Sequence, residues 1–361
     1  MNAFKGTISA AAAARAAGRA IAGIFPGAEI DCLPVADGGD GLLDALAPAL
    51  GGRLLSSRVE GPYGAPVKAR WLLAGKTAVI EMAEASGLRH GRVGRLRPLD
   101  ASTYGVGQLV LAAIRQGARE VIVGLGGSAS NDGGAGCAAA LGFGLLDARD
   151  RPVARGARGL AALKSIRPGS GPGRLAGVKV IGLADVKNTL CGRSGSARVF
   201  GPQKGAGPEE VAFMEAALLN YAGVLKRDLG ADVARLAGGA AAGGLGAGLA
   251  AFSGAELIDG SAFVLARTGF DRHLKRAGLV ITGEGCFDRQ TFFGKAPGAV
   301  IARARAADKP VVVVCGRSLI RGRAALARLG VGAVVESGAY GETAAAVERA
   351  VALAMPRILE R

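Results

Sequence analysis

The chain has 361 residues, 50% of them hydrophobic and 20% charged, which excludes a disordered protein and predicts a globular chain with two domains. A formal net charge of +16 predicts attraction to anions, but aromatic residues are only 4% and no basic arm occurs, so we predict no nucleic-acid partner. Five widely spaced cysteines and two histidines support neither a disulfide framework nor a zinc site, and they predict a reducing cytoplasm.

Short runs rich in Val, Ile and Leu alternate with helical patterns along the chain. The predicted strands cover residues 30–35, 77–82, 120–124, 178–184, 279–283, 310–315 and 331–336. The predicted helices cover residues 8–24, 40–50, 101–116, 132–142, 208–229, 295–307, 318–329 and 342–355. Residues 149–177 are rich in Arg, Gly and Pro, and we predict a long loop there. The alternation indicates an α/β protein, with parallel sheets covered by helices on both faces.

Two segments need a test for membrane or secretion signals. The N-terminus lacks a secretory pattern, because Arg15 and Arg19 interrupt its small apolar residues. The run from Leu236 to Ala255 has no charges and is long enough for a membrane span. Gly and Ala dominate this run, which favours a loop with a closely packed helix, and we predict no membrane partner.

The stretch from Val121 to Gly136, VIVGLGGSASNDGGAG, carries the strongest functional signal. A predicted strand leads into glycines and then a helix, so successive backbone N–H groups can form an anion-binding concavity beside the positive end of the helix. The pattern therefore predicts a phosphate site. The alternative is a tight turn between strand and helix that binds no ligand.

Carboxylates follow several of the predicted strands, and lysines stand in the same polar segments. The carboxylates are Asp37, Asp132, Asp185, Glu284 and Asp288, and the lysines are Lys5, Lys204 and Lys295. Ligands of open α/β sheets bind beyond the carboxyl ends of the strands, and oxygen ligands suit Mg²⁺. Phosphoryl transfer needs such a set of metal ligands, N–H cradle, cation and orienting carboxylate. The alternative for a single strand-end aspartate is a helix cap.

Nucleotide-binding motifs offer a competing function. Residues 75–77 resemble the end of a P-loop, but Arg70 stands where that motif requires glycine. The turn from Gly124 to Ala129 does match a relaxed dinucleotide fingerprint after a strand. An NAD-dependent oxidoreductase is therefore an alternative to a kinase.

Eight segments, in order along essentially the whole chain, resemble a known family. They are FKGTISA (4–10), PVADGGDG (34–41), IEMAEASGL (80–88), TYGVGQL (103–109), GLGGSASNDGGAG (124–136), FGPQKGA (200–206), AAGGLGAGL (241–249) and ITGEGCFDRQTFFGKAP (281–297). On these motifs the chain resembles the bacterial type I glycerate kinases of the glyoxylate and glucarate pathways.

The resemblance implies an ATP- and Mg²⁺-dependent kinase that phosphorylates D-glycerate, most often giving 2-phosphoglycerate. It also implies two intertwined α/β domains with the active site in the cleft between them. One would be flavodoxin-like and built from residues 1–62 and 285–361, and the other would be inserted as residues 63–284. The oligomeric state stays open between monomer and dimer.

Residues at matching motif positions receive roles from the same resemblance. We expect Asp185 to orient or deprotonate the glycerate hydroxyl, since a base must lie within hydrogen-bond reach of it. Lys5 and Lys204 are expected to bind the glycerate carboxylate or a phosphate. Glu284 and Asp288 are expected to be Mg²⁺ ligands, with structural hydrogen bonding as the alternative. Substrate or phosphate contacts are further expected from Asp37, Gly126, Gly127, Ser128, Asn131, Asp132, Asn188 and Lys295.

The chain also departs from the family pattern. The family usually opens with a short strand and Pro-Asp before the FKG motif, whereas this chain begins Met1-Asn2-Ala3-Phe4. We therefore expect the first strand to be missing, which would leave backbone groups on its neighbours unpaired. Cys286 stands where arginine is usual, which would lower the affinity for phosphate unless Arg289 or Arg193 substitutes. These departures keep a third reading open, an inactive relative that binds nucleotide without turnover.

Overall fold

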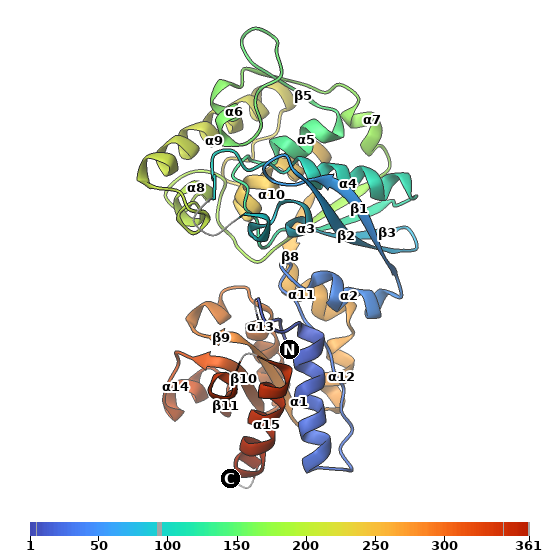
Figure 1. Ribbon diagram of the computed structural model, residues 1–361, viewed down its shortest axis with the longest axis vertical. Helices are drawn as coiled ribbons and strands as arrows, with labels where there is room; N and C mark the ends of the chain where they lie inside the picture. The colour runs from blue at the N-terminus through green and yellow to red at the C-terminus, as the bar shows by residue number, and fades with distance from the viewer. Residues whose placement is uncertain (5, 92–95, 342, 360–361) are drawn as a thin grey trace. The chain divides into compact units, whose positions relative to one another are not determined.

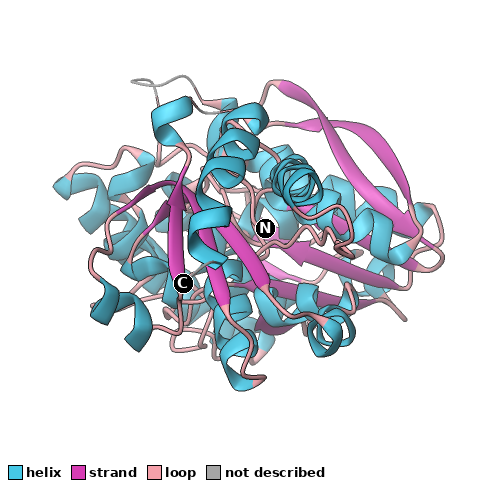
Figure 2. Cartoon of the chain, turned by 90° about the horizontal axis from the view of Figure 1, so that it is seen from below, coloured by secondary structure: helices cyan, strands magenta, loops and turns pink. Residues whose placement is uncertain are grey.

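The computed structural model describes residues 1–361 except residues 5, 92–95, 342 and 360–361 (Figure 1). The chain forms two compact units. The terminal unit contains Met1–Leu50 and Asp259–Arg361, and the central unit contains Gly51–Ile258. Both units combine strands with helices, so the chain is an α/β protein as predicted. Figure 2 shows the helices and strands of the chain by colour.

The terminal unit is built on a parallel sheet of three strands in the order β11-β10-β9. Its strands are β9 (Val280–Phe287), β10 (Val311–Ser318) and β11 (Ala333–Glu336). Its α-helices are α1 (Ala10–Ile24), α2 (Leu42–Leu50), α11 (Gly260–Arg267), α12 (Phe270–Arg276), α13 (Ala296–Ala306), α14 (Arg323–Arg328) and α15 (Ala344–Leu359). Two 3₁₀ turns complete it, η4 (Arg289–Phe292) and η5 (Gly338–Tyr340).

The central strand β10 decides how the terminal unit is layered. Its run of valines is buried on both faces, as expected for a parallel strand covered by helices. Because side chains alternate along a strand, Val312 and Val314 pack with α1 and α15 on one face. Val311 and Val313 pack with α12 and α13 on the other. Helices α1 and α15 lie side by side, as Figure 1 shows.

The central unit has a mixed sheet of six strands in the order β1-β2-β3-β4-β7-β8 and a small two-stranded sheet. Its strands are β1 (Arg53–Glu60), β2 (Pro66–Ala74), β3 (Thr77–Glu81), β4 (Glu120–Gly124), β5 (Gly144–Leu146), β6 (Ser165–Arg167), β7 (Lys179–Ala184) and β8 (Glu256–Asp259). Strands β1, β2 and β3 form antiparallel hairpins, whereas β3, β4 and β7 run parallel.

Helices pack around this sheet, and loops follow the carboxyl ends of its parallel strands. The helices are α3 (Met82–Ser86), α4 (Tyr104–Arg115), α5 (Ala135–Leu141), α6 (Ala157–Ala162), α7 (Gly171–Leu175), α8 (Ser196–Phe200), α9 (Pro208–Leu229) and α10 (Leu245–Ser253), with 3₁₀ turns η1 (Leu88–His90), η2 (Pro202–Lys204) and η3 (Ala241–Gly244). Glu81 pairs with Gly124, and Gly124 pairs with Leu183, so β3, β4 and β7 end together. The loops after these three strands therefore start at one edge.

Two expectations about elements were wrong, and strands β1 and β2 were missed. Residues 30–35 form no strand, because the backbone hydrogen bonds found among the described residues join only Leu33 O and Val35 N of this segment, both to Met1. Residues 149–177 are not one loop but contain α6, β6 and α7. Strands β1 and β2 were not predicted, since exposed and buried residues are mixed along β1 and along the first half of β2.

The observed boundaries of the units also differ from the expected ones. The chain passes between units at Leu50 and Ile258, not after residue 62 and before residue 285. The reason is strand pairing: β1 pairs along its whole length with β2, and β9 pairs with β10. Among the described residues, no helix has both the length and the hydropathy needed to cross a membrane.

Candidate active site

The predicted phosphate loop, residues 125–134, joins β4 to α5 in the central unit. Backbone hydrogen bonds fix it against the α3–η1 segment, from Leu88 N to Gly127 O at 3.0 Å and from Ala129 N to Ser86 O at 2.9 Å. Gly127 has a φ of +74°, which glycine adopts without strain. Gly126 is half-buried and Gly127 is exposed, so this part of the loop leaves its backbone accessible to a ligand.

Lys204, at the end of η2, reaches this loop from another part of the sequence. Its Nζ donates to Ser128 Oγ at 3.0 Å and to Ser130 O at 2.6 Å. The lysine is only 3% exposed. Burial lowers the pKa of Lys204 to about 7, although the negative charge of Asp132 raises it by a smaller amount. The structure thus places the Lys204 amine beside Ser128. The sequence predicted each of them as a site residue but did not predict that they meet.

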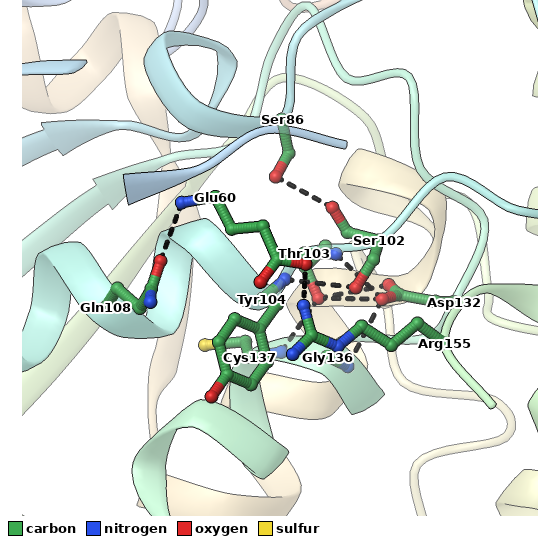
Figure 3. Close-up of polar contacts among 10 residues, drawn as sticks. All are labelled: Glu60, Ser86, Ser102, Thr103, Tyr104, Gln108, Asp132, Gly136, Cys137 and Arg155. Carbon is green, nitrogen blue, oxygen red and sulfur yellow. Dashed lines mark hydrogen bonds and ion pairs between the residues drawn. The ribbon is translucent and has the colours of Figure 1, made fainter. Parts of the chain in front are cut away.

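Asp132 is fully buried, and its carboxylate is engaged inside the protein (Figure 3). It accepts hydrogen bonds from Thr103 N at 2.8 Å and from Thr103 Oγ1 at 3.0 and 3.1 Å. It also accepts from Gly134 N at 3.1 Å and Gly136 N at 3.2 Å, at the start of α5. Burial raises the pKa of Asp132, and these hydrogen bonds oppose that rise. Asp132 therefore fixes the loop to α4 and α5.

Further bonds extend this network around Thr103, which sequence reasoning missed. The Thr103 hydroxyl accepts from Cys137 N at 3.0 Å, and Ser86 Oγ donates to Ser102 O at 2.9 Å. Figure 3 also shows Arg155 in contact with Tyr104 and Glu60. A threonine gives no signal in a single sequence, because many threonines are exposed and only tertiary packing selects this one.

Asn131 is also fully buried. Its Nδ2 donates to Pro98 O at 3.2 Å, while its Oδ1 lacks a hydrogen-bond partner among the described residues. An unpaired buried carbonyl costs free energy, so this atom is available to a water molecule or a ligand donor. The predicted substrate contact of Asn131 stays a prediction.

The second glycine-rich segment, residues 238–248, packs directly on the loop. Gly133 N donates to Gly243 O at 3.0 Å, and a Cβ on Gly243 would overlap Ser130 O. A Cβ on Gly248 would likewise overlap Gly133 O. These glycines therefore allow two backbones to approach each other, which is a structural reason for part of the motif.

Asp185 and Asn188 follow β7 at the same sheet edge as the loop. Asp185 comes directly after the last residue of the strand and is half-buried. Asn188 Nδ2 donates to Ser194 O at 2.9 Å, and Asn188 O accepts from Ala240 N at 3.1 Å. The strand register thus places the residue before Asp185 close to the end of β4, while the Asn188 amide is bonded within its own loop.

In the terminal unit, Glu284, Asp288 and Lys295 form a cluster near the end of β9. Glu284 Oε1 accepts from Thr291 Oγ1 at 2.5 Å, and its Oε2 accepts from Lys295 Nζ at 3.4 Å. Lys295 Nζ lies 4.0 Å from Asp288 Oδ1. Burial raises the pKa of Glu284, and Thr291 and Lys295 oppose the rise. Like Thr103 in the central unit, Thr291 is a residue of the candidate site that was not predicted from the sequence.

Asp37 is buried near the N-terminus of the same unit. Its Oδ1 accepts from Gly39 N at 3.2 Å, and its Oδ2 accepts from Asn2 Nδ2 at 3.5 Å. Gly260 packs against the Asp37 carbonyl, where a Cβ would overlap it. Lys5, the remaining predicted residue, lies outside the described residues.

The two carboxylates predicted as metal ligands fit Mg²⁺ only in part. Carboxylate oxygens are the donors that Mg²⁺ takes, and it commonly uses one or two of them together with substrate phosphates. Glu284 and Asp288 supply two such groups, but Lys295 already provides a positive charge between them. No group of three or more potential ligands occurs among the described residues. These residues therefore suit a metal that arrives bound to phosphate and not one held by the protein alone.

Comparison with known proteins places this arrangement in a family. The model of the glycerate kinase family matches residues 1–358. The chain is 42% identical to "Glycerate kinase" of Halalkalibacterium halodurans and 40% identical to "Glycerate 2-kinase" of Escherichia coli. Each alignment has 317 residues and covers 87% of this chain and 83% of the relative.

A solved structure agrees with these relatives. The crystal structure of "putative glycerate kinase 2" from Salmonella typhimurium LT2 aligns with a TM-score of 0.83 at 38% identity. The alignment covers 100% of this chain and 98% of that one. The fingerprint at Gly124–Ala129 therefore does not indicate an oxidoreductase, and the chain belongs to the glycerate kinase family.

Proposed function

We propose that this protein transfers the γ-phosphoryl group of ATP to a hydroxyl of D-glycerate, with Mg²⁺, and gives 2-phosphoglycerate. The observation that carries the proposal is the glycine loop of the central unit, whose accessible backbone at Gly126 and Gly127 lies next to the buried Lys204 amine. Membership of the glycerate kinase family supports the substrate. The free state of all five cysteines fits the cytoplasm that we propose as its compartment.

The loop and Lys204 suit the binding of phosphate. Backbone N–H groups bind phosphate oxygens without needing a side chain, and a nearby ammonium group stabilises the negative charge. Ser128 and Ser130 are both bonded to Lys204, so the amine also holds the loop in shape. We propose that Asp132 and Asn131 act by fixing this loop, because both are fully buried.

Asp185 is our candidate for the carboxylate that receives the proton. The glycerate oxygen attacks the γ-phosphorus, the bond to the leaving ADP oxygen breaks, and the hydroxyl proton passes to the Asp185 carboxylate. The half-buried position of Asp185 after β7 leaves it accessible to a substrate. Glu284 and Asp288 would hold a phosphate-bound Mg²⁺, which supplies positive charge at the phosphate oxygens.

The test is ADP release with ATP, Mg²⁺ and D-glycerate, with the phosphate position read by phosphorus NMR. We expect turnover that needs Mg²⁺, prefers D- over L-glycerate, and falls on the order of a thousandfold in Asp185→Asn. Asp232→Asn is the matched control, since Asp232 is exposed and forms an ion pair with Lys226 at the surface.

Each outcome has a definite reading. Loss of activity in Asp185→Asn with unchanged folding supports the assigned role. Equal activity of the two variants would remove Asp185 from the mechanism while leaving the kinase in place. Nucleotide binding without turnover in the unchanged, folded protein would favour an inactive relative.

A further inference from the structure

Ser128 and Lys204 form a close pair that the proposed transfer to glycerate does not use for any bond that forms or breaks. Lys204 Nζ lies 3.0 Å from Ser128 Oγ and 2.6 Å from the carbonyl oxygen of Ser130. A serine becomes a nucleophile when an amine base lies within hydrogen-bond reach of its hydroxyl and a third group holds that amine in place. The three residues supply these three parts.

The Lys204 amine acts as a base only in its neutral form. The side chain is buried, and this burial lowers the pKa of Lys204 to about 7, while the negative charge of Asp132 opposes the fall. Both forms of the amine are therefore populated near neutral pH. In the neutral form Nζ still donates to Ser130 O, and its lone pair accepts from the Ser128 hydroxyl, so the buried amine keeps both partners.

The backbone around Ser128 supplies the donors that a phosphoryl transfer needs. The N–H groups of Gly126, Gly127 and Ser128 make no hydrogen bond to another described residue. Bonds through Gly127 O and Ala129 N fix the loop on either side of Ser128. Preorganised, unpaired N–H groups stabilise the negative charge on phosphoryl oxygens during transfer. Ser128 is 7% exposed and follows the exposed Gly127, which leaves a small phosphoryl compound one open approach.

We propose that Ser128 is an activated nucleophile, with Lys204 as its base, and that it accepts the γ-phosphoryl group of ATP when glycerate is absent. The choice of ATP as donor rests on the proposed function. Ser128 Oγ forms a bond to the γ-phosphorus, the bond from that phosphorus to the ADP oxygen breaks, and the hydroxyl proton passes to Lys204 Nζ. The products are ADP, a phosphorylated Ser128 and the ammonium form of Lys204, whose charge stabilises the new phosphate group.

The alternative for this pair is purely structural. In that case the Lys204 ammonium only holds the loop through Ser128 and Ser130, and no covalent product forms. The two possibilities therefore differ in the mass of the protein after it meets a phosphoryl donor.

The first experiment incubates the full chain with ATP and Mg²⁺ without glycerate, and mass spectrometry of the intact protein and its peptides locates the phosphoryl group. We expect one group, on Ser128, and none in Ser128→Ala. In Lys204→Met its rate of formation should fall on the order of a hundredfold, because the base is lost. The matched controls Ser56→Ala and Lys226→Met remove an exposed serine and an exposed lysine, and both should keep the rate of the unchanged protein.

The second experiment needs no nucleotide, because an alkyl fluorophosphonate carries its own leaving group. Ser128 Oγ attacks the phosphorus, fluoride leaves, and the proton passes to Lys204 Nζ as before. We expect labelling of Ser128 that is at least about tenfold faster in the unchanged protein than in Lys204→Met. Melting curves show whether each variant is folded, and the labelling of the unchanged protein is readable even when a variant is not.

Three outcomes would overturn the proposal. The first is a protein that turns over D-glycerate with ATP but gains no phosphoryl group on Ser128 when glycerate is left out. The second is an equal rate of labelling in the unchanged protein and in folded Lys204→Met. The third is an unchanged protein whose Ser128 does not react with the fluorophosphonate. Failure of the proposed function is seen separately, because a protein without glycerate turnover whose Ser128 is still labelled faster than in Lys204→Met supports the nucleophile and its base.

Discussion

At the scale of single residues, burial controls the chemistry of the Lys204 amine. The pKa of Lys204 falls from 10.5 to about 7 chiefly because the charged form loses its hydration, and Asp132 restores only part of that loss. The amine still donates to Ser128 Oγ and Ser130 O. Its protonation state therefore changes within the physiological range, unlike that of an exposed lysine.

This titration predicts a pH dependence of stability. Between pH 7 and pH 9 the unfolded lysine remains protonated while the folded one loses its proton, so the unfolded state binds more protons and the free energy of unfolding rises with pH. The rise amounts to about 2 kcal/mol over this window. Urea unfolding at several pH values should show that Lys204→Met lacks this contribution.

Lys226→Met is the control for this measurement, because Lys226 is exposed and pairs with Asp232 at the surface. It should keep the dependence on pH. If Lys204→Met and Lys226→Met show the same slope, the Lys204 amine does not titrate near neutrality.

At the scale of elements, the order of the glycine loop depends on the start of α5. This helix begins after Gly134, which has a φ of +82° and has no side chain that could cap the helix. Asp132 replaces the cap by accepting from Gly134 N and Gly136 N. The same carboxylate holds Thr103 at the start of α4, so one side chain couples a loop and two helices.

We therefore expect Asp132→Ala to lower the free energy of unfolding by about 3 kcal/mol or more, since several buried donors lose their acceptor. Chemical denaturation measures the change. Asp232→Ala, at an exposed position, should stay within about 0.5 kcal/mol of the unchanged protein. A loss for Asp132→Ala no larger than that of the control would show that the network does not hold the loop.

Some helices and strands could be predicted from the local sequence pattern, and others could not. The predicted limits of β4 and α9 agree with the structure, because each has a clear apolar pattern and α9 begins with a proline. Residues 30–35 were also predicted as a strand, yet among the described residues their backbone hydrogen bonds involve only Leu33 O and Val35 N, both with Met1. A strand exists only where another backbone accepts its hydrogen bonds, and a local pattern cannot report that.

At the scale of the whole molecule, the excess of basic residues would attract the proposed substrate ATP from a distance. The formal net charge of +16 favours the approach of ATP, which is anionic. Salt screens such attraction, with a Debye length of about 10 Å at 0.1 M. We expect kcat/KM for ATP to fall several-fold as the ionic strength rises from about 0.01 to 0.15 M. Steady-state kinetics in an inert salt, with the kcat monitored separately, measures this effect.

A constant kcat/KM across that range would show that the charge has no part in binding ATP. A fall in kcat alone would instead point to an effect of salt on the folded protein. The comparison with melting temperatures at each salt concentration separates the two cases.

The sequence by itself determined the α/β class, the limits of elements such as β4 and α9, and the family, because these depend on local patterns and on motifs in order. Only the tertiary structure decided which polar groups meet. It brought Lys204 to Ser128, Thr103 to Asp132 and Thr291 to Glu284. Such contacts join residues that are often distant in the chain, and they exist only after strands pair and helices pack.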